Sequence, residues 1–427
     1  MVDLVCGMDL MSLRRQDYVM ILCFHLLNHL LMFMLPTLIL FFRSDFGLSY
    51  TDAGLLWTSL IVVMTTLSVG VGFFSDRFRS FRYFLILSGL FLMSLVWLFL
   101  SFSVSVWQLY LGFTLMGVGA STFHPPVLAI ITEMFEDDKG KALSLNMAIG
   151  MGGTAVSPIV FSGLGLLVGG WEVVARVIGI GGLVFLFVLG ILGYVSGMFD
   201  RTNWSGRRGS DGEVMVTMDG DVVSHSFDIS FIFSGLVLVP LLFISLRSSF
   251  FRTASVFTSL LYEDYLHLTK NESTVATALV LGFASMFTLV GGFLSDRTRP
   301  RVALVVSSVG SAFASVGLVY LTDYADLVSF STFYFLLLAF YYVGSPAGSA
   351  LLADRVEKEQ RGKLFGALFS LGQVLSLLTP LAFGWIKDNI GLSASFLMIM
   401  VLALIALVLS FYIYFEERGR EKEGAEL

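Results

Sequence analysis

The sequence Gly-Phe-Phe-Ser-Asp-Arg at residues 72–77 returns as Gly-Phe-Leu-Ser-Asp-Arg at residues 292–297, which lie 220 positions later. Each copy ends one long apolar segment and is followed by further arginines before the next apolar segment begins. A repeat at so long an interval, in a chain this apolar, indicates two structural halves built from membrane helices. The repeated phrase therefore predicts a duplicated membrane protein, an organisation typical of transporters.

The composition supports a membrane protein. The 427 residues are 56% hydrophobic and only 14% charged, whereas soluble domains average about 25% charged residues. A spanning helix needs roughly 20 apolar residues, and twelve such stretches are present. They are continuous and do not alternate, which excludes an outer-membrane barrel and predicts an all-α polytopic protein. The predicted spans are 18–42, 52–75, 83–103, 106–134, 141–168, 173–198, 230–262, 274–295, 302–322, 327–354, 363–386 and 391–415.

The repeat extends beyond the opening phrase. Pro158 matches Pro380 and the Gly-Lys pair at 140–141 matches the pair at 362–363, each at an offset of 222. The small drift from 220 indicates that the halves correspond helix for helix. The predicted domains are a first six-helix bundle (1–198), a cytoplasmic linker (199–228), a second six-helix bundle (229–415) and a cytoplasmic tail (416–427). Within the linker, residues 213–224 fit either a small hairpin or a disordered segment.

Lysine and arginine placement predicts the orientation, because these residues gather on the cytoplasmic side. With the N-terminus inside, twenty of the 26 lysines and arginines fall in inner segments. The outer loops hold only Arg43, Lys270 and Lys387, with Arg176 near an outer helix end. We therefore expect a multi-pass protein of the plasma membrane with both termini in the cytoplasm.

Other functional classes leave no signal in the sequence. No cleavable signal peptide is evident, and the two cysteines, Cys6 and Cys23, give no disulfide framework. The spacings show no metal-ligand cluster, nucleophile triad or phosphate loop. The glycine-rich residues 150–153 fall inside a predicted helix, so they indicate close packing. We expect no cofactor, no bound metal, no enzymatic activity and no nucleic-acid partner.

Twelve helices in two halves, a central cytoplasmic loop and Gly-x-x-x-Asp-Arg after the second and eighth helices resemble the major facilitator superfamily. The resemblance implies a gate in which the glycines allow close helix approach and the aspartates accept hydrogen bonds at a neighbouring helix N-terminus. Simple positive-inside anchoring would explain the arginines but not the other residues. The expected gating residues are Gly72, Asp76, Arg77, Gly292, Asp296 and Arg297.

A narrower resemblance lies in the first and fourth predicted helices. His-Leu-Leu-Asn at 25–28 and Gly-Ala-Ser-Thr-Phe-His-Pro at 119–125 are similar to the fosmidomycin-resistance branch of exporters. That branch has an acid where this chain has His29 and another where it has Pro126. Residues 153–158 form a degenerate version of a Gly-Pro phrase associated with antiporters. These resemblances favour efflux.

Ionisable side chains inside a membrane are costly, so each is a functional hypothesis. In the first predicted helix, His25, Asn28 and His29 are spaced i, i+3, i+4 and share one face. The offset of 220 maps that face onto serines in the seventh helix, and the same stripe continues to Arg252. In the superfamily the first, fourth, seventh and tenth helices line the central cavity. The residues expected to line it are Ser121, His124, Ser245, Ser248, Ser249, Ser255, Ser259, Tyr341, Tyr342 and Ser345.

Arg252 is the expected substrate anchor, because a guanidinium can donate two parallel hydrogen bonds to a carboxylate, phosphate or phosphonate. The alternative is that it ties helices together through backbone carbonyls. Arg247 lies roughly 200° from the start of the stripe at about 100° per residue, so we expect it to pack against a neighbouring helix or to reach the inner interface. His25, His29 and His124 are candidate proton couplers, or neutral histidines in interhelical hydrogen bonds.

These observations predict a secondary active transporter that moves a small anionic or zwitterionic solute by alternating access. Proton exchange is the expected energy source, with uniport as the alternative, and a monomer is the expected state. A membrane-embedded enzyme would need convergent nucleophiles, bases or metal ligands. A transporter-like receptor that binds a solute without translocation is the other alternative, although the tail from Glu416 to Leu427 is short for a signalling extension.

Overall fold

The computed structural model describes residues 2–135, 139–200, 235–324, 326–354 and 376–425. The linker predicted at 199–228, with its hairpin or disordered alternatives, lies outside the described residues from position 201 onward. All regular structure in the described residues is helical. Eleven of these helical segments are long and apolar enough to cross a membrane, which confirms the prediction of an all-α polytopic protein.

The helices form one series before the linker and a second series after it. The first series is α1 (Val2–Phe33), α2 (Leu35–Phe46), α3 (Tyr50–Arg77), the short η1 (Arg79–Phe81), α4 (Arg82–Leu100), α5 (Val106–Ser121), α6 (His124–Met134), α7 (Lys139–Val168), α8 (Trp171–Val195) and the short η2 (Met198–Asp200). The second series is α9 (Gly235–Asp264), α10 (Lys270–Arg297), α11 (Pro300–Leu321), α12 (Leu327–Asp354), the helical residues 376–389, and α14 (Leu392–Ala425).

Two spans that the sequence predicts as single helices are each divided in two. The stretch 18–42 is broken between α1 and α2 at Met34, and the stretch 106–134 is broken between α5 and α6. Proline explains both breaks, because it has no N–H to donate to the preceding turn and is favoured in the first turn of a new helix. Pro36 lies in the first turn of α2, and Pro125 and Pro126 lie in the first turn of α6.

The starts of two equivalent helices also follow the 220-residue repeat. Ser49 and Asp52 form a reciprocal capping box at the start of α3, and Thr269 and Glu272 form one at the start of α10. In both boxes the hydroxyl accepts from the backbone of the acid, and the acid accepts from the backbone of the cap residue. The two boxes are again 220 positions apart, so equivalent helices start at equivalent residues.

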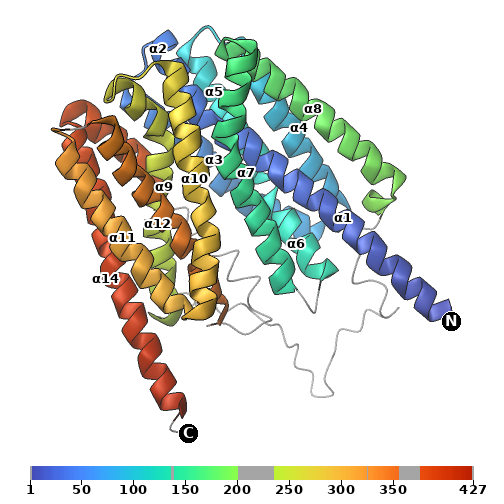
Figure 1. The fold of residues 1–427 in the computed structure, drawn as a ribbon. Coiled ribbons are helices and arrows are strands. Elements are labelled where there is room, and N and C mark those ends of the chain that lie inside the picture. The colour runs from blue at the N-terminus through green and yellow to red at the C-terminus, as the bar shows by residue number, and fades with distance from the viewer. Residues whose placement is uncertain (1, 136–138, 201–234, 325, 355–375, 426–427) are drawn as a thin grey trace.

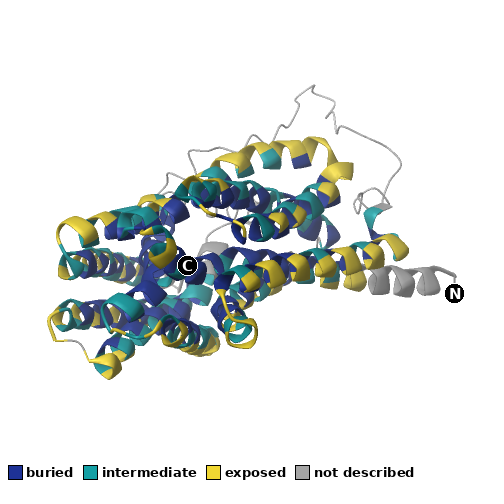
Figure 2. Ribbon diagram, turned by 90° about the horizontal axis from the view of Figure 1, so that it is seen from above, coloured by how far each residue is buried: buried dark blue, intermediate teal, exposed yellow. Residues whose placement is uncertain are grey.

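The buried and exposed faces suit a lipid environment. Figure 2 shows exposed residues on the outward faces of the helices and buried residues where helices meet. Large apolar side chains such as those of Phe187, Leu289 and Val408 are more than two-thirds exposed. In water such a surface would be costly, whereas lipid tails cover it without penalty.

The two helix series meet where α7 packs against α10 and, at the end of the molecule where α2 lies (top of Figure 1), where α2 packs against α9 and α10. There, Arg43 Nη1 lies 2.5 Å from Asp264 Oδ1 across the two series. Lys270 Nζ lies 3.7 Å from Asp45 Oδ1 and also donates a hydrogen bond to the hydroxyl of Ser44. Because both pairs are partly exposed, each contributes little alone, but together they fix the register of α2 against α9 and α10.

The start of α3 is held at the same end by the second helix series. The carboxylate of Asp388 accepts hydrogen bonds from the backbone N–H groups of Tyr50 (3.2 Å) and Thr51 (2.7 Å). These N–H groups belong to the first helical turn and have no partner within the helix, so an acid here is favourable. Farther along α3, the hydroxyl of Thr58 donates to the carbonyl of Leu377 at 2.8 Å. This end of the molecule is thus closed by hydrogen bonds between the two series.

Candidate functional site

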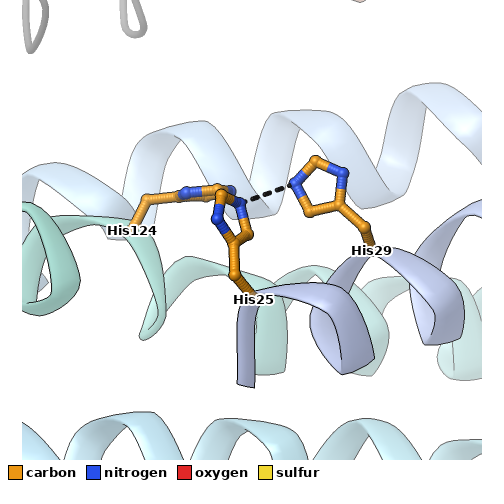
Figure 3. A group of neighbouring side chains, drawn as sticks. All are labelled: His25, His29 and His124. Atoms are coloured by element: carbon orange, nitrogen blue, oxygen red, sulfur yellow. Dashed lines mark hydrogen bonds between the residues drawn. The ribbon is translucent and has the colours of Figure 1, made fainter. Parts of the chain in front are cut away.

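Three histidines from two helices meet in the interior (Figure 3). His25 and His29 lie one turn apart on α1, and His124 is the first residue of α6, directly after the break that Pro125 and Pro126 impose. One ring nitrogen of each lies within 4.8 Å of the others. The ring centroids are 4.7 to 5.8 Å apart. We call these three side chains the histidine cluster. The sequence-based expectation of no such cluster was wrong, because about a hundred residues separate His124 from the other two.

Two glycines of α7 make room for the histidine cluster. A Cβ placed on Gly150 would lie 2.6 Å from His25 Nε2 and 3.1 Å from His29 Nε2. A Cβ on Gly153 would lie 2.9 Å from the Cβ of His29. Such contacts are shorter than packed atoms tolerate, so only glycine lets the imidazoles lie flat against α7. Gly150 and Gly153 therefore serve close packing, as predicted, whereas a Cβ on Gly152 would meet nothing within 4 Å.

A chain of hydrogen bonds runs through the cluster. His25 Nδ1 lies 2.9 Å from Asn146 Oδ1, His25 Nε2 lies 3.1 Å from His29 Nε2, and His29 Nδ1 lies 2.8 Å from Thr154 Oγ1. Asn146 Oδ1 can only accept, so His25 Nδ1–H donates to it and leaves Nε2 to accept from His29 Nε2–H. His29 Nδ1 then accepts the hydroxyl proton of Thr154. Two neutral imidazoles thus form one connected path between two polar residues of α7.

Asn146 and Thr154 were not among the residues that the sequence placed in the site. A usable signal was present, since the two lie eight positions apart and so project from neighbouring faces of α7.

Asn28 was predicted to share the cavity-lining face with His25 and His29, but the structure places it elsewhere. Its amide donates to Met93 Sδ at 3.4 Å, and its Oδ1 is buried without a partner in the described residues. Asn28 therefore faces α4 and does not join the cluster.

The two arginines of α9 have different surroundings. Arg247 is buried, and its guanidinium donates to Ser307 Oγ at 2.7 Å and to the carbonyls of Phe340 (3.0 Å) and Tyr341 (2.7 Å). It ties α9 to α11 and α12, as its angular position on the helix predicted. The role of tying helices through carbonyls, which the sequence left open for Arg252, belongs to Arg247.

Arg252 lies close enough to the histidine cluster to act on it electrostatically. Its charge acts on both His29 and His124, which belong to the first helix series. Its Nη1 is buried and has no hydrogen-bond partner among the described residues. A buried guanidinium nitrogen without an acceptor is costly, so this atom is available to donate a hydrogen bond.

The tyrosines of α12 surround Arg252 only in part. The ring of Tyr341 stacks on Phe251 with centroids 3.9 Å apart. The hydroxyl of Tyr342 is buried without a partner in the part of the chain that is described. Together with Thr154 and Ser255, Tyr342 and Phe251 line a small cavity between the two helix series. Three serines of the predicted stripe, Ser245, Ser249 and Ser255, each donate to a backbone carbonyl one turn earlier in α9.

The expected gating residues lie at the opposite end from the closed one. Asp76, Arg77, Asp296 and Arg297 are all exposed. The close approach expected of Gly292 is wrong for this conformation, since a Cβ there would meet no described atom within 4 Å. A Cβ on Gly72 would find its nearest neighbour, Pro125 Cβ, only at 3.8 Å, an ordinary packing distance. The neighbouring Gly291 has that role, because a Cβ on it would overlap the backbone of Val343 in α12.

Arg82 connects helices of the first series at the end opposite to the closed one. This buried arginine lies 2.8 Å from Glu133 Oε2 and donates through Nε to the carbonyl of Ser75 at 3.2 Å. It also lies 3.7 Å from Asp76. The repeated phrase is thus connected to the end of α6 through an arginine that lies five residues after it, and the sequence analysis did not single that arginine out.

Comparisons with known proteins agree with this architecture. A family model described as Major Facilitator Superfamily matches residues 21–345 and 241–426. The chain is 21% identical over 401 residues to the uncharacterized MFS-type transporter YfnC of Bacillus subtilis (strain 168), and the match covers 93% of this chain and 92% of that protein.

Solved structures with the same fold include several transporters. A bacterial homolog to the human lysosomal transporter Spinster, in an inward-facing and unoccupied conformation, superposes with a TM-score of 0.73 at 16% identity and covers 94% of this chain and 96% of its own. A D-xylose-proton symporter gives 0.69 at 16% identity, with 93% and 96% coverage. The nucleoside transporter NupG (D323A mutant) gives 0.66 at 11% identity, with 93% and 98% coverage. At these identities the likeness establishes the fold alone.

Proposed function

The chain belongs to the major facilitator superfamily, and from this premise we propose that it is a secondary active transporter of a small organic anion or zwitterion. The superfamily is a class of transporters and not of enzymes. Alternating access between the two helix series moves the solute past a central site. The observation that carries the proposal is the buried Nη1 of Arg252, which has no acceptor among the described residues and whose charge acts on His29 and His124.

The charges around the site favour an anion over a cation. Arg252 and three histidines converge there, whereas the acids of the first series, Asp17 and Glu133, lie toward the inner ends of α1 and α6. A guanidinium offers two parallel donors to a carboxylate, phosphate or phosphonate. A transporter of organic cations would instead need a buried acid to pair with its cargo.

Binding to the purified protein tests the charge preference before the substrate is known. We expect small carboxylates, phosphate and methylphosphonate to raise the unfolding temperature more than uncharged or cationic analogues of equal size. A ligand at 100 times its dissociation constant stabilises the native state by about 2.7 kcal/mol. Preferential stabilisation by amines over carboxylates would contradict an anion site.

We propose that the histidine cluster carries the coupling proton, since histidine titrates near neutral pH and the cluster lies beside Arg252. The resemblance of residues 25–28 and 119–125 to fosmidomycin-resistance exporters, together with the degenerate Gly-Pro phrase at 153–158, supports export in exchange for protons. Uniport is the alternative. The sign of the pH gradient that drives flux distinguishes antiport from symport.

The coupling proposal predicts that His124→Gln separates solute flux from proton flux. Glutamine keeps a hydrogen-bonding side chain but cannot carry a proton, so downhill exchange should continue while the pH gradient no longer drives accumulation above equilibrium. The measurement is uptake of the best-stabilising anion into proteoliposomes with and without an imposed gradient. His267→Gln, which changes an exposed histidine, is the matched control. Undiminished gradient-driven accumulation by His124→Gln would refute the assignment.

We also propose that the protein acts as a monomer in the plasma membrane with both termini in the cytoplasm. The excess of lysine and arginine in the inner segments supports this orientation. It follows that the closed end, which carries Arg43, Lys270 and Asp388, faces outward. Protease or tag accessibility at either terminus in intact cells checks the orientation.

A further inference from the structure

We propose that the histidine cluster also binds one divalent transition-metal ion, of the class that includes Zn²⁺, Co²⁺ and Ni²⁺. Imidazole nitrogen is a preferred ligand of these ions, and three histidines with an open fourth position form a common zinc arrangement. The inference goes beyond the transport function and does not depend on it. It is carried by the positions of the ring nitrogens and by the groups that hold the rings.

The ligand spacing is close to that of a tetrahedral site. Zinc–nitrogen bonds of 2.0–2.1 Å place the nitrogens of a tetrahedron about 3.3 Å apart. The Nε2 atoms of His25 and His29 are already 3.1 Å apart. One ligand nitrogen from each of the three rings lies within 4.8 Å of the others, so side-chain shifts of about 1.5 Å bring all three to tetrahedral spacing. Figure 3 shows the three rings converging from α1 and α6.

Hydrogen bonds outside the cluster hold the rings in the orientation that a metal needs. His25 Nδ1–H donates to Asn146 Oδ1, which leaves its Nε2 lone pair facing the centre. His29 Nδ1 lies beside the Thr154 hydroxyl, which also lies 3.3 Å from the carbonyl of Gly150. Metal binding requires the tautomer of His29 opposite to the one in the metal-free hydrogen-bond chain. The Thr154 hydroxyl then donates to the carbonyl of Gly150 and accepts from His29 Nδ1–H, so that His29 Nε2 presents a second lone pair to the centre. Metal ligation by histidine characteristically has such partners on the other nitrogen.

The charge of Arg252 determines what accompanies the metal. A dication beside a buried guanidinium, with no acid among the described residues at this depth, is unfavourable unless an anion offsets the charge. The open fourth position provides the place for that anion, and Arg252 Nη1 provides a donor for it. The expected species is therefore a metal ion held by three histidines and one small anion, such as hydroxide or chloride.

Cobalt binding to the purified full-length protein tests the site directly. Co²⁺, added as its chloride to protein without a histidine tag, should bind with one ion per chain. Tetrahedral Co²⁺ absorbs visible light far more strongly than octahedral Co²⁺, so the spectrum reports the geometry, and Zn²⁺ should displace it. We expect His29→Gln to weaken binding at least 100-fold. Asn146→Leu, which removes only the positioning partner of His25, should weaken it about 10- to 100-fold.

The two histidines outside the cluster supply the control. The double variant His225→Gln/His267→Gln should bind Co²⁺ with wild-type affinity and spectrum. The unfolding temperature without metal, measured for every variant, separates lost ligation from lost structure. A weak octahedral spectrum in the wild type would overturn the proposal, and so would Co²⁺ affinity unchanged in a folded His29→Gln variant. Transport assays run with a chelator keep these results independent of the proposed transport function.

Discussion

Replacing Arg252 with methionine is expected to abolish saturable transport of the anion while leaving the fold intact. Methionine has similar length and fills the space, so the packing of α9 should survive. The anion would lose a charged, forked donor in a buried site. Truncating one partner of such a pair costs about 2–5 kcal/mol, or roughly 30- to 4,000-fold in affinity. The measurement is the rise in unfolding temperature with added anion, followed by uptake into proteoliposomes.

Two further variants separate binding from structure. Arg252→Lys keeps the charge but cannot donate two parallel hydrogen bonds, so it should bind the anion with intermediate affinity. Arg247→Met removes the donor to Ser307 and to the carbonyls of Phe340 and Tyr341, so its main effect should be a lower unfolding temperature. If a folded Arg252→Met protein binds the anion with the affinity of the wild type, Arg252 is not the anchor.

Leucine at Gly54 is expected to prevent the outer end from closing and therefore to stop transport. Gly54 lies on α3, where a Cβ would sit 2.5 Å from the carbonyl oxygen of Pro380. A Cβ on Gly384 would likewise overlap the backbone of Tyr50. A backbone atom cannot move aside as a flexible side chain can, so a larger residue must separate the helices. Alternating access needs both the open and the closed outer end, and this variant would populate only the open one.

The state of the outer end can be measured through Ser255, which lines the cavity between the two helix series. In a Cys6→Ser/Cys23→Ser background, we expect Ser255→Cys to react with a membrane-impermeant thiol reagent from the outer side much faster when Gly54→Leu is present. Gly70→Leu is the matched control, because a Cβ at Gly70 on the same helix meets nothing within 4 Å. Equal reaction rates in the Gly54→Leu and Gly70→Leu proteins would contradict the assigned closure.

Local patterns in the sequence were sufficient for the fold. The 220-residue offset depends on helix-by-helix correspondence, and the capping boxes at Ser49 and Thr269 obey it. Helix periodicity also separated Arg252 from Arg247, because their angular positions decide which of the two reaches a neighbouring helix. The breaks at Met34 and before His124 were missed, although prolines lie at both. The prediction counted apolar length, which a broken helix satisfies as well as a continuous one.

The sequence predicted which residues lie near the site but not which of them contact one another. His25, His29 and Arg252 were expected to line one cavity, but sequence spacing cannot show that His124 touches His25 across helices. Asn28 shares a helix face with the histidines, and yet its amide reaches Met93 on α4. A face of an α-helix is broad enough to contact two neighbouring helices, so a shared face does not imply a shared partner. Contacts of this kind depend on how helices cross, which a single sequence does not encode locally.

Uptake by the wild-type protein tests the central claim most directly. The radiolabelled anion that stabilises the purified protein most is supplied to proteoliposomes with an imposed pH gradient. The account predicts saturable uptake that exceeds equilibrium in one direction of the gradient and is absent from Arg252→Met proteoliposomes. Binding of the anion without uptake above that of protein-free liposomes would contradict transport and leave a receptor in its place.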